Sequence, residues 1–360
     1  MDSYSLLDPV EPLYDARIRG AFLLTTVDGS RVHMSGGCWG APCSAQPPRM
    51  MVAIPKEFEG AEIAQRSGKF CINLTSRQER DWHDRFFSGE HTIDPKLFLR
   101  SPSGCPVPAH AVAYFDCQLE KAIDLGDFLL AIGRVTAAEA LHPDWHNLSV
   151  NEIIATADPR GQQEAHLPYE GFDFDVSVLD PAPATSENPP HPARFEEIYG
   201  LRQWGLFFTS TAHHGRGHFH IGCWSMQVSH KPPRMAICFS KSWEGSRWVQ
   251  EGAAFAMTLL TKDQIDFVSR FASGKQSPAD YPPDTWLRKN DLYILRQGLA
   301  CFICKPEQIV DLDDFLLVIA PVQEYEWLNK QAVNLQDQDL KKIGSIEHFV
   351  DPEVGFDLPR

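Results

Sequence analysis

The sequence contains an internal repeat, which restricts this 360-residue chain to folds that two like domains can form. Residues 20–89 align with residues 205–274 without a gap, and 24 of the 70 aligned positions are identical. The shared segments include a Gly-Cys-Trp motif at 37–39 and 222–224. They also include a Pro-Pro-Arg-Met motif. Identity at this level over a gapless alignment indicates the tandem duplication of one domain.

The segment between the two copies has the composition of an extended linker. Residues 180–193 contain five prolines and no apolar periodicity, as in semi-rigid linkers. We therefore predict a first domain over residues 1–179, a linker over 180–193 and a second domain over 194–360. Twofold dimers are the commonest oligomers, and fusion makes such a pairing permanent. The two domains are therefore expected to form an intrachain pseudo-dimer, and a further homodimer of the whole chain stays open.

Charge and hydropathy exclude several classes of partner. With 33 basic and 48 acidic side chains, the formal net charge is −15, which repels phosphate backbones and anionic membrane surfaces. No apolar run reaches the ~20 residues of a transmembrane helix. Residues 1–10 lack the basic and then apolar pattern of a signal peptide. The sequence therefore predicts a cytoplasmic protein that binds neither nucleic acid nor membrane.

The nine cysteines are scattered through apolar stretches, which is typical of reduced thiols in a protein core rather than of a disulfide framework. One Cys-x-x-Cys motif, Cys301 to Cys304, lies in a segment that reads as a strand and has no second pair. We therefore expect two core thiols there rather than zinc ligands or a redox pair.

Each copy contains many short segments with strand character. Apolar, β-branched or aromatic runs are bounded by Gly, Pro or Ser and predict strands; they lie at 20–27, 50–54, 70–74, 205–211, 235–240 and 255–260. Residues 61–67 and 246–252 predict short helices, and the capping pattern from Thr261 to Gln264 predicts the start of a longer one. Two more strands are expected around Cys117 and Phe128. Many short strands with few helices predict a mainly β fold of small barrels.

A succession of motifs in each copy carries a family resemblance. In the first copy, Ser-Ala-Gln-Pro-Pro at 44–48 precedes an apolar strand, Lys56, a short helix and Phe-Cys-Ile-Asn-Leu at 70–74. This order resembles that of the flavin reductase-like FMN-binding split barrels. The tryptophan eight residues before the first proline, Trp39, resembles the flavoredoxin branch in particular. The resemblance covers most of both copies and implies two tandem split β-barrel domains that bind FMN.

The strands and loop around the Gly-Cys-Trp motif form the predicted cofactor site. An isoalloxazine ring needs a flat apolar wall and a few polar donors, and the flavin phosphate needs N–H groups and a cation. The candidate cofactor-binding residues are Cys38, Trp39, Ser44, Arg49 and Lys56 in the first copy and Cys223, Trp224, Ser229, Arg234 and Lys241 in the second. The alternative interpretation is structural: the proline pair fixes a turn, the tryptophan belongs to the core and the basic side chains are solvated.

Two positions depart from the family pattern. Members that use NADH commonly carry Gly-Asp-His in the late strand pair, whereas this chain has Phe128 and Phe315 at the histidine position. The hydroxylated residue that often meets the phosphate is replaced by Glu59-Gly60 and Glu244-Gly245, and an acidic side chain repels a phosphate unless it points away. These departures predict that the protein is not a standard NADH:flavin reductase and that NADH and NADPH reduce it slowly or not at all.

Histidines are concentrated in the second copy, where residues 211–220 contain four of them. Alternation places His218 and His220 on the same face of a strand. Together with His214 or His230, they could ligate a metal or a haem iron. No carboxylate or cysteine stands at an obvious metal-ligand spacing from them.

Three interpretations of these histidines remain, and His33 of the first copy aligns with His218. We favour a polar hairpin whose histidines are exposed. Acid or base catalysis at a substrate site, by His33, His218 and His220, ranks second. Metal binding ranks last, and no metal site is predicted.

The leading hypothesis is an FMN-dependent oxidoreductase or electron-transfer flavoprotein that acts on a small-molecule substrate or with a redox partner. Related barrels borrow residues from the partner subunit at each flavin site, which implies sites between the halves. Divergence of the two copies predicts closer to one flavin per chain than two. The alternative hypothesis is a haem- or other ligand-binding protein that uses the histidines of the second copy, and a catalytically silent scaffold is the third. An absorption spectrum separates these hypotheses.

Overall fold

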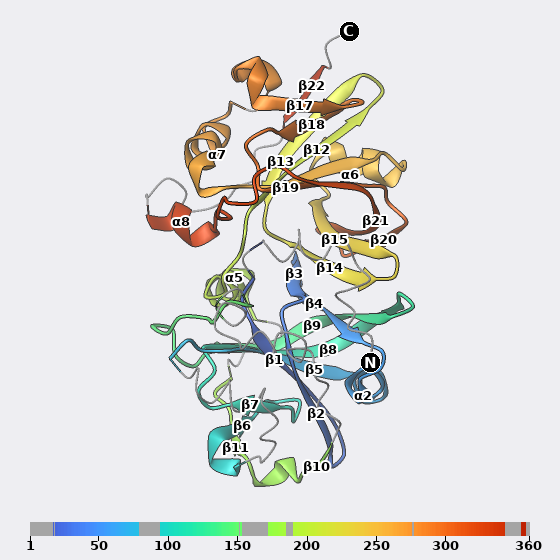
Figure 1. The fold of residues 1–360 in the computed structure, drawn as a ribbon. Coiled ribbons are helices and arrows are strands. Elements are labelled where there is room, and N and C mark those ends of the chain that lie inside the picture. Colours follow the sequence, from blue (N-terminus) through green and yellow to red (C-terminus); the bar gives the residue numbers. More distant parts are fainter. Residues whose placement is uncertain are drawn as a thin grey trace. The chain divides into compact units, whose positions relative to one another are not determined.

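The computed structural model describes residues 17, 19–78, 94–150, 152, 172–184, 190–275, 277–342 and 354–357. The chain divides into two compact units. The first-copy unit is Arg19–Gln203, and the second-copy unit combines Trp204–Arg360 with Met1–Ile18. Each unit is mainly β with short helices and has the split-barrel fold predicted from the sequence (Figure 1). The fold class is therefore confirmed, and the pairing of the copies as a pseudo-dimer stays a prediction.

An antiparallel sheet of eight strands forms the barrel of the first-copy unit, in the order β10-β2-β1-β5-β8-β9-β4-β3. Its strands are β1 (Phe22–Asp28), β2 (Arg31–Gly37), β3 (Gly40–Ala45), β4 (Pro48–Pro55), β5 (Lys69–Leu74), β8 (Ala113–Asp124), β9 (Phe128–Ala140) and β10 (Phe172–Asp173). Helix α2 (Glu59–Ser67) packs against β1 and β2. A smaller sheet joins β6 (Phe98–Arg100), β7 (Pro106–Pro108) and β11 (Asp180–Pro181), beside the 3₁₀ helices η2 (Pro95–Leu97) and η3 (Val176–Val178).

The second-copy unit repeats this strand order as β22-β13-β12-β16-β19-β21-β15-β14. Its strands are β12 (Phe207–His213), β13 (Arg216–Gly222), β14 (Ser225–His230), β15 (Pro233–Ser240), β16 (Phe255–Leu259), β19 (Ala300–Cys304), β20 (Gln308–Asp311), β21 (Phe315–Trp327) and β22 (Val354–Asp357). A separate hairpin pairs β17 (Trp286–Lys289) with β18 (Leu292–Leu295). The helices are α6 (Glu244–Gln250), α7 (Ile265–Ala272), α8 (Asp337–Lys342) and the 3₁₀ turns η4 (Lys262–Gln264), η5 (Pro278–Asp280) and η6 (Pro283–Thr285).

The two sheets differ where β8 of the first copy is continuous and the second copy has β19 and β20 in its place. Pro306 lies in this interruption. Because proline has no N–H to donate to a strand ladder, it is excluded from the interior of a paired strand. Both β19 and β20 still pair with β21, so the strand order of the barrel is kept.

The predicted elements lie where the sequence placed them, with boundaries shifted by a few residues. The predicted helix after Thr261 is α7, and the capping box between Thr261 and Gln264 is present around η4. Cys301 and Cys304 are buried in β19. All nine cysteines are free thiols; seven are buried, as predicted, whereas Cys38 and Cys223 are partly exposed.

Alternation of apolar residues along the strands builds the core of each barrel. In the first-copy unit, Phe70, Ile72 and Leu74 of β5 belong to one cluster of buried residues with Phe115 of β8. Period-2 spacing puts such residues on one face of the sheet. Helix α5 (Pro192–Tyr199) adds Phe195 to the same cluster, with its ring 6.0 Å from Phe115.

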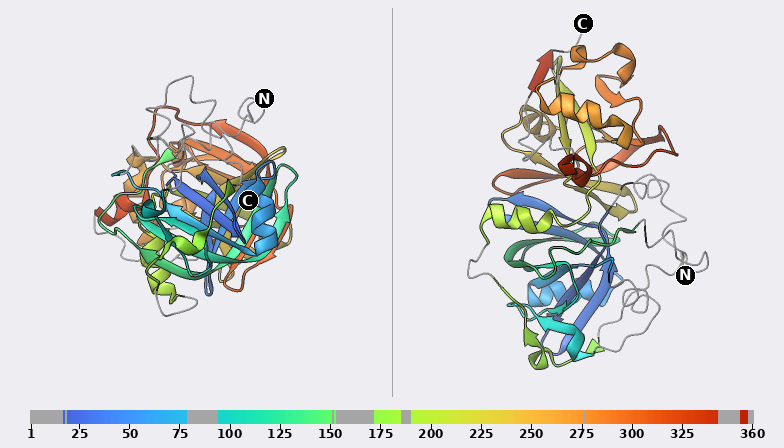
Figure 2. Two further views of the ribbon diagram at one scale, coloured as in Figure 1. Left: turned by 90° about the horizontal axis from the view of Figure 1, so that it is seen from below. Right: turned by 90° about the vertical axis from the view of Figure 1, so that its left-hand side faces the viewer.

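The compact units do not coincide with the predicted domain boundaries. Residues 194–203 fall within the predicted second domain, but they belong to the first-copy unit. Helix α5 packs on β3 and β9 of that unit (Figure 2), and Arg194 of this helix binds Glu139 at 2.8 Å. The unit boundary therefore follows Gln203 rather than the proline-rich linker, because α5 contributes its apolar face to the first barrel. Within the described residues, no helix is long and apolar enough to cross a membrane.

Candidate functional site

The predicted cofactor residues of each copy lie at two separate places along one strand. Trp39 and Cys38 lie in the link between β2 and β3, where the Trp39 carbonyl accepts a hydrogen bond from Ala53 of β4. Arg49 is the second residue of β4, and Lys56 directly follows the strand. At about 3.3 Å per residue, these two cations are roughly 23 Å apart along the strand. They cannot serve the same phosphate, so only one of them, Arg49 or Lys56, could supply its positive charge within one copy.

Around Arg49, the predicted residues stabilise the proline turn. The Ser44 hydroxyl donates to the Pro47 carbonyl at 2.7 Å and accepts from Arg49 at 3.3 Å. The guanidinium of Arg49 is bonded to Glu120 at 2.6 Å. The second copy repeats these contacts: Ser229 donates to Pro232 at 2.7 Å, and Arg234 binds Glu307 at 2.8 Å. This agrees with the structural interpretation of the serine and the prolines.

The two copies differ in the number of arginines that bond the glutamate beside the proline turn. In the first copy, Glu120 is shared between Arg49 and Arg134, with Arg134 at 2.6 Å. In the second copy, Pro321 occupies the position across the strand pair that Arg134 holds in the first. Glu120 is thus bonded by two guanidinium groups, whereas Glu307 is bonded by Arg234.

At the other end of β4, the lysine is also paired. Lys56 binds Asp124 at 2.8 Å, and Lys241 binds Asp311 at 2.8 Å. Hydrogen bonds from Lys56 and from the Gly126 N–H lower the pKa of Asp124. All four side chains are more than a third exposed. Exposed ion pairs contribute only about 0–1 kcal/mol, so an incoming phosphate can compete for either lysine.

The aromatic wall expected for a flavin ring is present and largely buried. Trp39 is 8% exposed and packs on Phe128, with ring centroids 5.0 Å apart. Trp224 packs on Phe315 in the same way, at 5.0 Å.

The glycines of this loop have a packing reason. A Cβ at Gly37 or Gly40 would come within 2.7 and 2.9 Å of the Phe22 ring. The residues of one unit therefore fit a flavin in part. They supply an aromatic wall and a half-buried Cys38 beside it, but their cations are already paired.

The histidines correct the favoured interpretation of an exposed hairpin. His33, His218 and His220 are each at most 2% exposed, because both faces of β2 and β13 are buried at these positions. Only His214, at the hairpin turn, is exposed, and His213 is partly so. The prediction that His218 and His220 share one face is confirmed, with ring centroids 6.1 Å apart.

Inside the second barrel, these imidazoles lack polar partners among the described residues. Neither ring nitrogen of His218 or His220 has a hydrogen bond, and neither do the hydroxyls of Thr209 and Thr211. His220 instead packs on Trp243, at 4.4 Å between ring centroids. Burial lowers the pKa of His218 to about 4. Burial, together with the neighbouring His218, lowers the pKa of His220 well below its usual value. Both rings are therefore neutral at pH 7.

The glycines of the two Glu-Gly pairs explain how helices α2 and α6 cover the buried histidines. Gly60 and Gly245 lie in the first turns of α2 and α6. A Cβ at Gly60 would lie 2.3 Å from His33 Cδ2, and one at Gly245 would lie 2.7 Å from His218 Nδ1. Each glycine therefore lets a helix approach the buried imidazole closely.

The acidic residue before each glycine is neutralised by an arginine. Arg31 donates to both carboxylate oxygens of Glu59, at 2.7 and 2.6 Å. Arg216 binds Glu244 at 2.9 Å. The expected repulsion between this carboxylate and a phosphate is thereby reduced, since each carboxylate already carries a cationic partner.

We expect Gly60→Ala to lower the free energy of unfolding of the first-copy unit by about 2 kcal/mol, the usual cost of overpacking a core. The added methyl group would overlap the His33 ring. Urea denaturation measures the change. His33→Ala in the same background removes the overlapping ring, so the double variant should be more stable than the sum of the two single effects. Simple additivity would show that the glycine is not required by the imidazole.

Sequence analysis missed two buried arginines, Arg17 and Arg202, each 1% exposed. Arg202 donates to the carbonyls of Gly20, Gly40 and Cys38. Arg202 thus fixes the backbone around the Gly-Cys-Trp motif of the first copy. The signal was present, because these arginines align with each other just upstream of the gapless repeat.

Arg17 does the same in the second-copy unit. It donates to Gly205, Ser225 and Cys223, with the Cys223 carbonyl at 2.6 Å. Arg17 precedes the first barrel in the sequence, and Arg202 precedes the second. Each arginine therefore belongs to the unit of the other copy, an exchange that the repeat alone does not reveal.

Each copy is a split barrel in which a tryptophan-containing loop lies beside the strand that follows the Pro-Pro turn. These features are typical of flavin-associated β-barrel proteins. The family model described as "Flavin reductase like domain" matches residues 17–148 and again residues 205–343. The chain therefore belongs to the flavin reductase-like domain family, as a tandem duplication.

Curated relatives share this domain at low identity. The reductase subunit HsaB of a flavin-dependent monooxygenase from Rhodococcus jostii is 30% identical over 131 residues, which cover 35% of this chain and 65% of HsaB. The stachydrine N-demethylase reductase subunit Stc3 from Rhizobium meliloti is 30% identical over 95 residues, which cover 26% of this chain and 41% of Stc3. The chain thus spans less than two thirds of the length of either relative.

Among solved structures, the NADH:FAD oxidoreductase SgcE6 of Streptomyces globisporus is similar to this chain. Its TM-score is 0.36 at 18% identity, covering 40% of this chain and 90% of SgcE6. The flavin reductase PheA2 has a TM-score of 0.34 at 24% identity, covering 41% of this chain and 99% of PheA2.

Proposed function

We propose that this chain is an FMN-dependent oxidoreductase or electron-transfer flavoprotein that receives electrons from a redox partner rather than directly from NADH. The observation that carries the proposal is the match of both copies to the flavin reductase-like domain. Bound flavin would supply hydride or single-electron transfer. Relatives named as the reductase subunits of a stachydrine N-demethylase and of a flavin-dependent monooxygenase support a partner protein.

The first copy is the better candidate for the flavin phosphate. Its support is the pair of guanidinium groups, Arg49 and Arg134, around Glu120, where the second copy has Pro321 in place of the second arginine. Trp39 would form one wall of the ring site and the adjoining backbone its polar edge. This difference between the copies favours about one flavin per chain.

Phe128 and Phe315 replace the histidine that NADH-using members commonly carry, which supports a redox partner as the source of electrons. Phe128 and Phe315 pack on Trp39 and Trp224 and present no ring nitrogen to a nicotinamide. Exclusion of direct NADH reduction rests on this replacement.

An absorption spectrum of the purified chain, followed by titration with FMN and anaerobic addition of NADH, tests the proposal. We expect flavin bands, binding of about one equivalent, and little bleaching by NADH although dithionite reduces the flavin fully. Phe128→His restores the residue that NADH-using members commonly carry, so its rate of reduction by NADH should rise by about tenfold or more, equivalent to about 1.4 kcal/mol of transition-state stabilisation.

Phe128→Leu is the matched control, since it removes the aromatic ring without adding a nitrogen. It should leave the NADH rate unchanged. A wild-type chain that NADH reduces rapidly would contradict the proposed electron source, and a chain that binds no flavin would contradict the function itself.

A haem- or other ligand-binding role stays the second candidate, on the strength of the two buried imidazoles His218 and His220. Their packing against Trp243 and Phe239 of the same barrel makes this candidate weaker, because an axial ligand must face the haem rather than its own core. A Soret band in the purified protein would favour it over flavin.

A further inference from the structure

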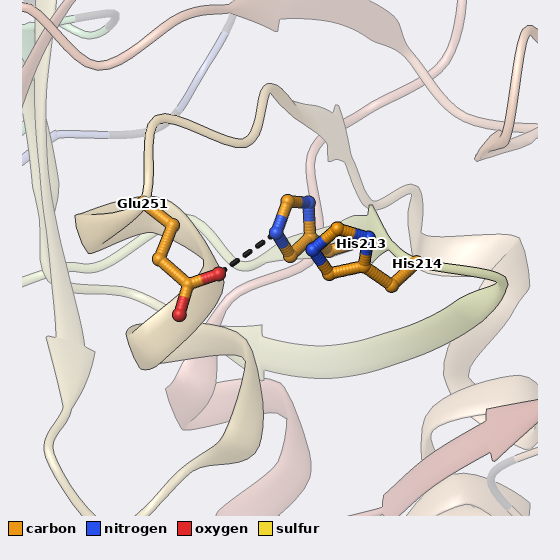
Figure 3. Close-up of side chains that lie close together, drawn as sticks. All are labelled: His213, His214 and Glu251. Carbon is orange, nitrogen blue, oxygen red and sulfur yellow. Dashed lines mark ion pairs between the residues drawn. The ribbon is translucent and has the colours of Figure 1, made fainter.

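We propose that the second-copy unit carries a divalent transition-metal site, with Zn²⁺ as the expected occupant, formed by His213, His214 and Glu251. One ligand atom from each of these residues lies within 4.8 Å of the others. Figure 3 shows both imidazoles at the hairpin turn and Glu251 reaching toward them from the end of α6. The site involves none of the residues assigned to the flavin.

The hairpin conformation brings two consecutive histidines to the same place. Neighbouring residues of a strand point to opposite faces, yet the rings of His213 and His214 have centroids 3.8 Å apart. His213 ends β12, and His214 turns the chain with a φ of 49°, followed by Gly215 with a φ of 77°. A left-handed residue at this point redirects its side chain, so that both imidazoles face Glu251.

The Glu251 carboxylate lies at the C-terminus of α6, where the helix dipole favours a cation. Glu251 is the C-cap of α6, and the partial negative charge of a helix C-terminus repels an acidic side chain. Its carboxylate oxygen lies 2.8 Å from His213 Nε2. That nitrogen has no hydrogen bond among the described residues, so the two atoms approach without the alignment of a hydrogen bond. A metal ion between them would offset the unfavourable charge.

The first copy shows what this place contains without a metal site. There, Asp28 and Arg66 align with His213 and Glu251 and form an ion pair with an N–O distance of 3.0 Å. Gly29 aligns with His214 and has a φ of 61°. The second copy thus has a histidine where the first has the residue that best tolerates this conformation. It also has a ligand set where the first has an ordinary ion pair.

Two imidazoles and one carboxylate are a ligand set that Zn²⁺ takes in proteins, with a fourth position left for water. The side chains of His213 and Glu251 are 23% and 57% exposed, so an ion can reach them without opening the fold. Bound metal would join the β12–β13 hairpin to α6. The same helix covers His218 through Gly245, so metal binding should also hold α6 over the buried imidazoles.

The test is calorimetric titration of ZnCl₂ into the full chain after treatment with a chelator. We expect one equivalent of Zn²⁺ to bind, with slower hydrogen exchange at the amides of α6. His214→Gly introduces the residue of the first copy and relieves the left-handed histidine, so it should fold at least as well as the wild type. It should weaken Zn²⁺ binding by more than about tenfold.

Glu251→Gln keeps the shape of the side chain and removes its charge, and it should weaken binding to a similar extent. His146→Asn removes an exposed histidine of the first-copy unit and should leave both stoichiometry and affinity unchanged. The absence of Zn²⁺ binding in the wild type, or equal affinity in His214→Gly, would overturn the proposal. Flavin content is unaffected by either result, so this test is independent of the proposed function.

Discussion

Arg202→Met should lower the free energy of unfolding of the first-copy unit by about 3 kcal/mol, the cost of leaving buried acceptors without their charged donor. Arg202 is 1% exposed. It donates to Gly20 at 2.8 Å and to Cys38 at 3.0 Å, and it also bonds the Gly40 carbonyl. Methionine keeps an apolar stem of similar length over the Phe22 ring, so the change isolates the lost hydrogen bonds.

The expected damage is local, and the measurement has to resolve the two units. A chain of two compact units need not unfold in one step, so hydrogen exchange should be followed separately over each unit alongside urea denaturation. Protection should fall in β1, β3 and the loop at Cys38. Arg17→Met is the mirror experiment, because Arg17 bonds Gly205 at 2.7 Å and Cys223 at 2.6 Å. It should destabilise the second-copy unit.

Arg194→Met is the matched control on helix α5. Arg194 forms ion pairs with Glu139 and Glu197, and its side chain is 34% exposed, so its loss should cost less than about 1 kcal/mol. If Arg202→Met were equally mild, the backbone around Cys38 would not depend on the guanidinium. Because this loop carries the proposed flavin wall, FMN affinity should fall with Arg202→Met and hold with Arg194→Met.

The repeat and its strand pattern predicted much of the fold, because both are local properties of the sequence. The apolar run at β5 and the capping box at Thr261 act over a few residues, and the duplication allowed most strands to be predicted twice. The exchange of Arg17 and Arg202 between copies was not predictable in this way. Alignment shows that the two arginines correspond, but it does not show which barrel each one enters.

The candidate site was less predictable, because residue type does not reveal which partner a side chain takes. Arg49 and Lys56 are the cations that a flavin phosphate needs. They are bonded to Glu120 and Asp124, which lie on β8 and far away in sequence. The burial of the histidines was also not predictable from residue type. Polar composition suggested an exposed hairpin, whereas both faces of β13 are buried and Gly245 lets α6 approach His218 closely.

The second-copy unit should lose stability steeply as the pH falls from about 6.5 to 4, over the range in which histidines of the unfolded chain take up protons. Burial lowers the pKa of His218 from 6.5 to about 4 and lowers that of His220 well below 6.5. A group with a lowered pKa binds more protons in the unfolded state. The free energy of unfolding therefore rises with pH between the folded and unfolded pKa values.

The expected loss is large. The shift at His218 corresponds to about 3 kcal/mol, at 1.36 kcal/mol per pKa unit, and the whole amount is lost once the pH is below both pKa values. His220 adds to this loss. In the first-copy unit, His110 also has a pKa lowered to about 4, by burial and then by His142. That unit should respond to acid as well, through His110.

His220→Ser separates this effect from the general acid sensitivity of carboxylates. Serine is the residue at the equivalent place in the first copy, Ser35, so the variant removes one titrating ring while keeping a residue that this fold already accepts. The variant loses some stability at pH 7, because it removes a ring packed on Trp243. Its stability should nevertheless fall by less than that of the wild type between pH 6.5 and 4, since one fewer proton is taken up on unfolding.

Urea denaturation at a series of pH values, with hydrogen exchange to assign each transition to its unit, measures the two slopes. Parallel slopes would mean that His220 is already protonated in the folded barrel, which its enclosure among Phe239, Trp243 and His218 opposes.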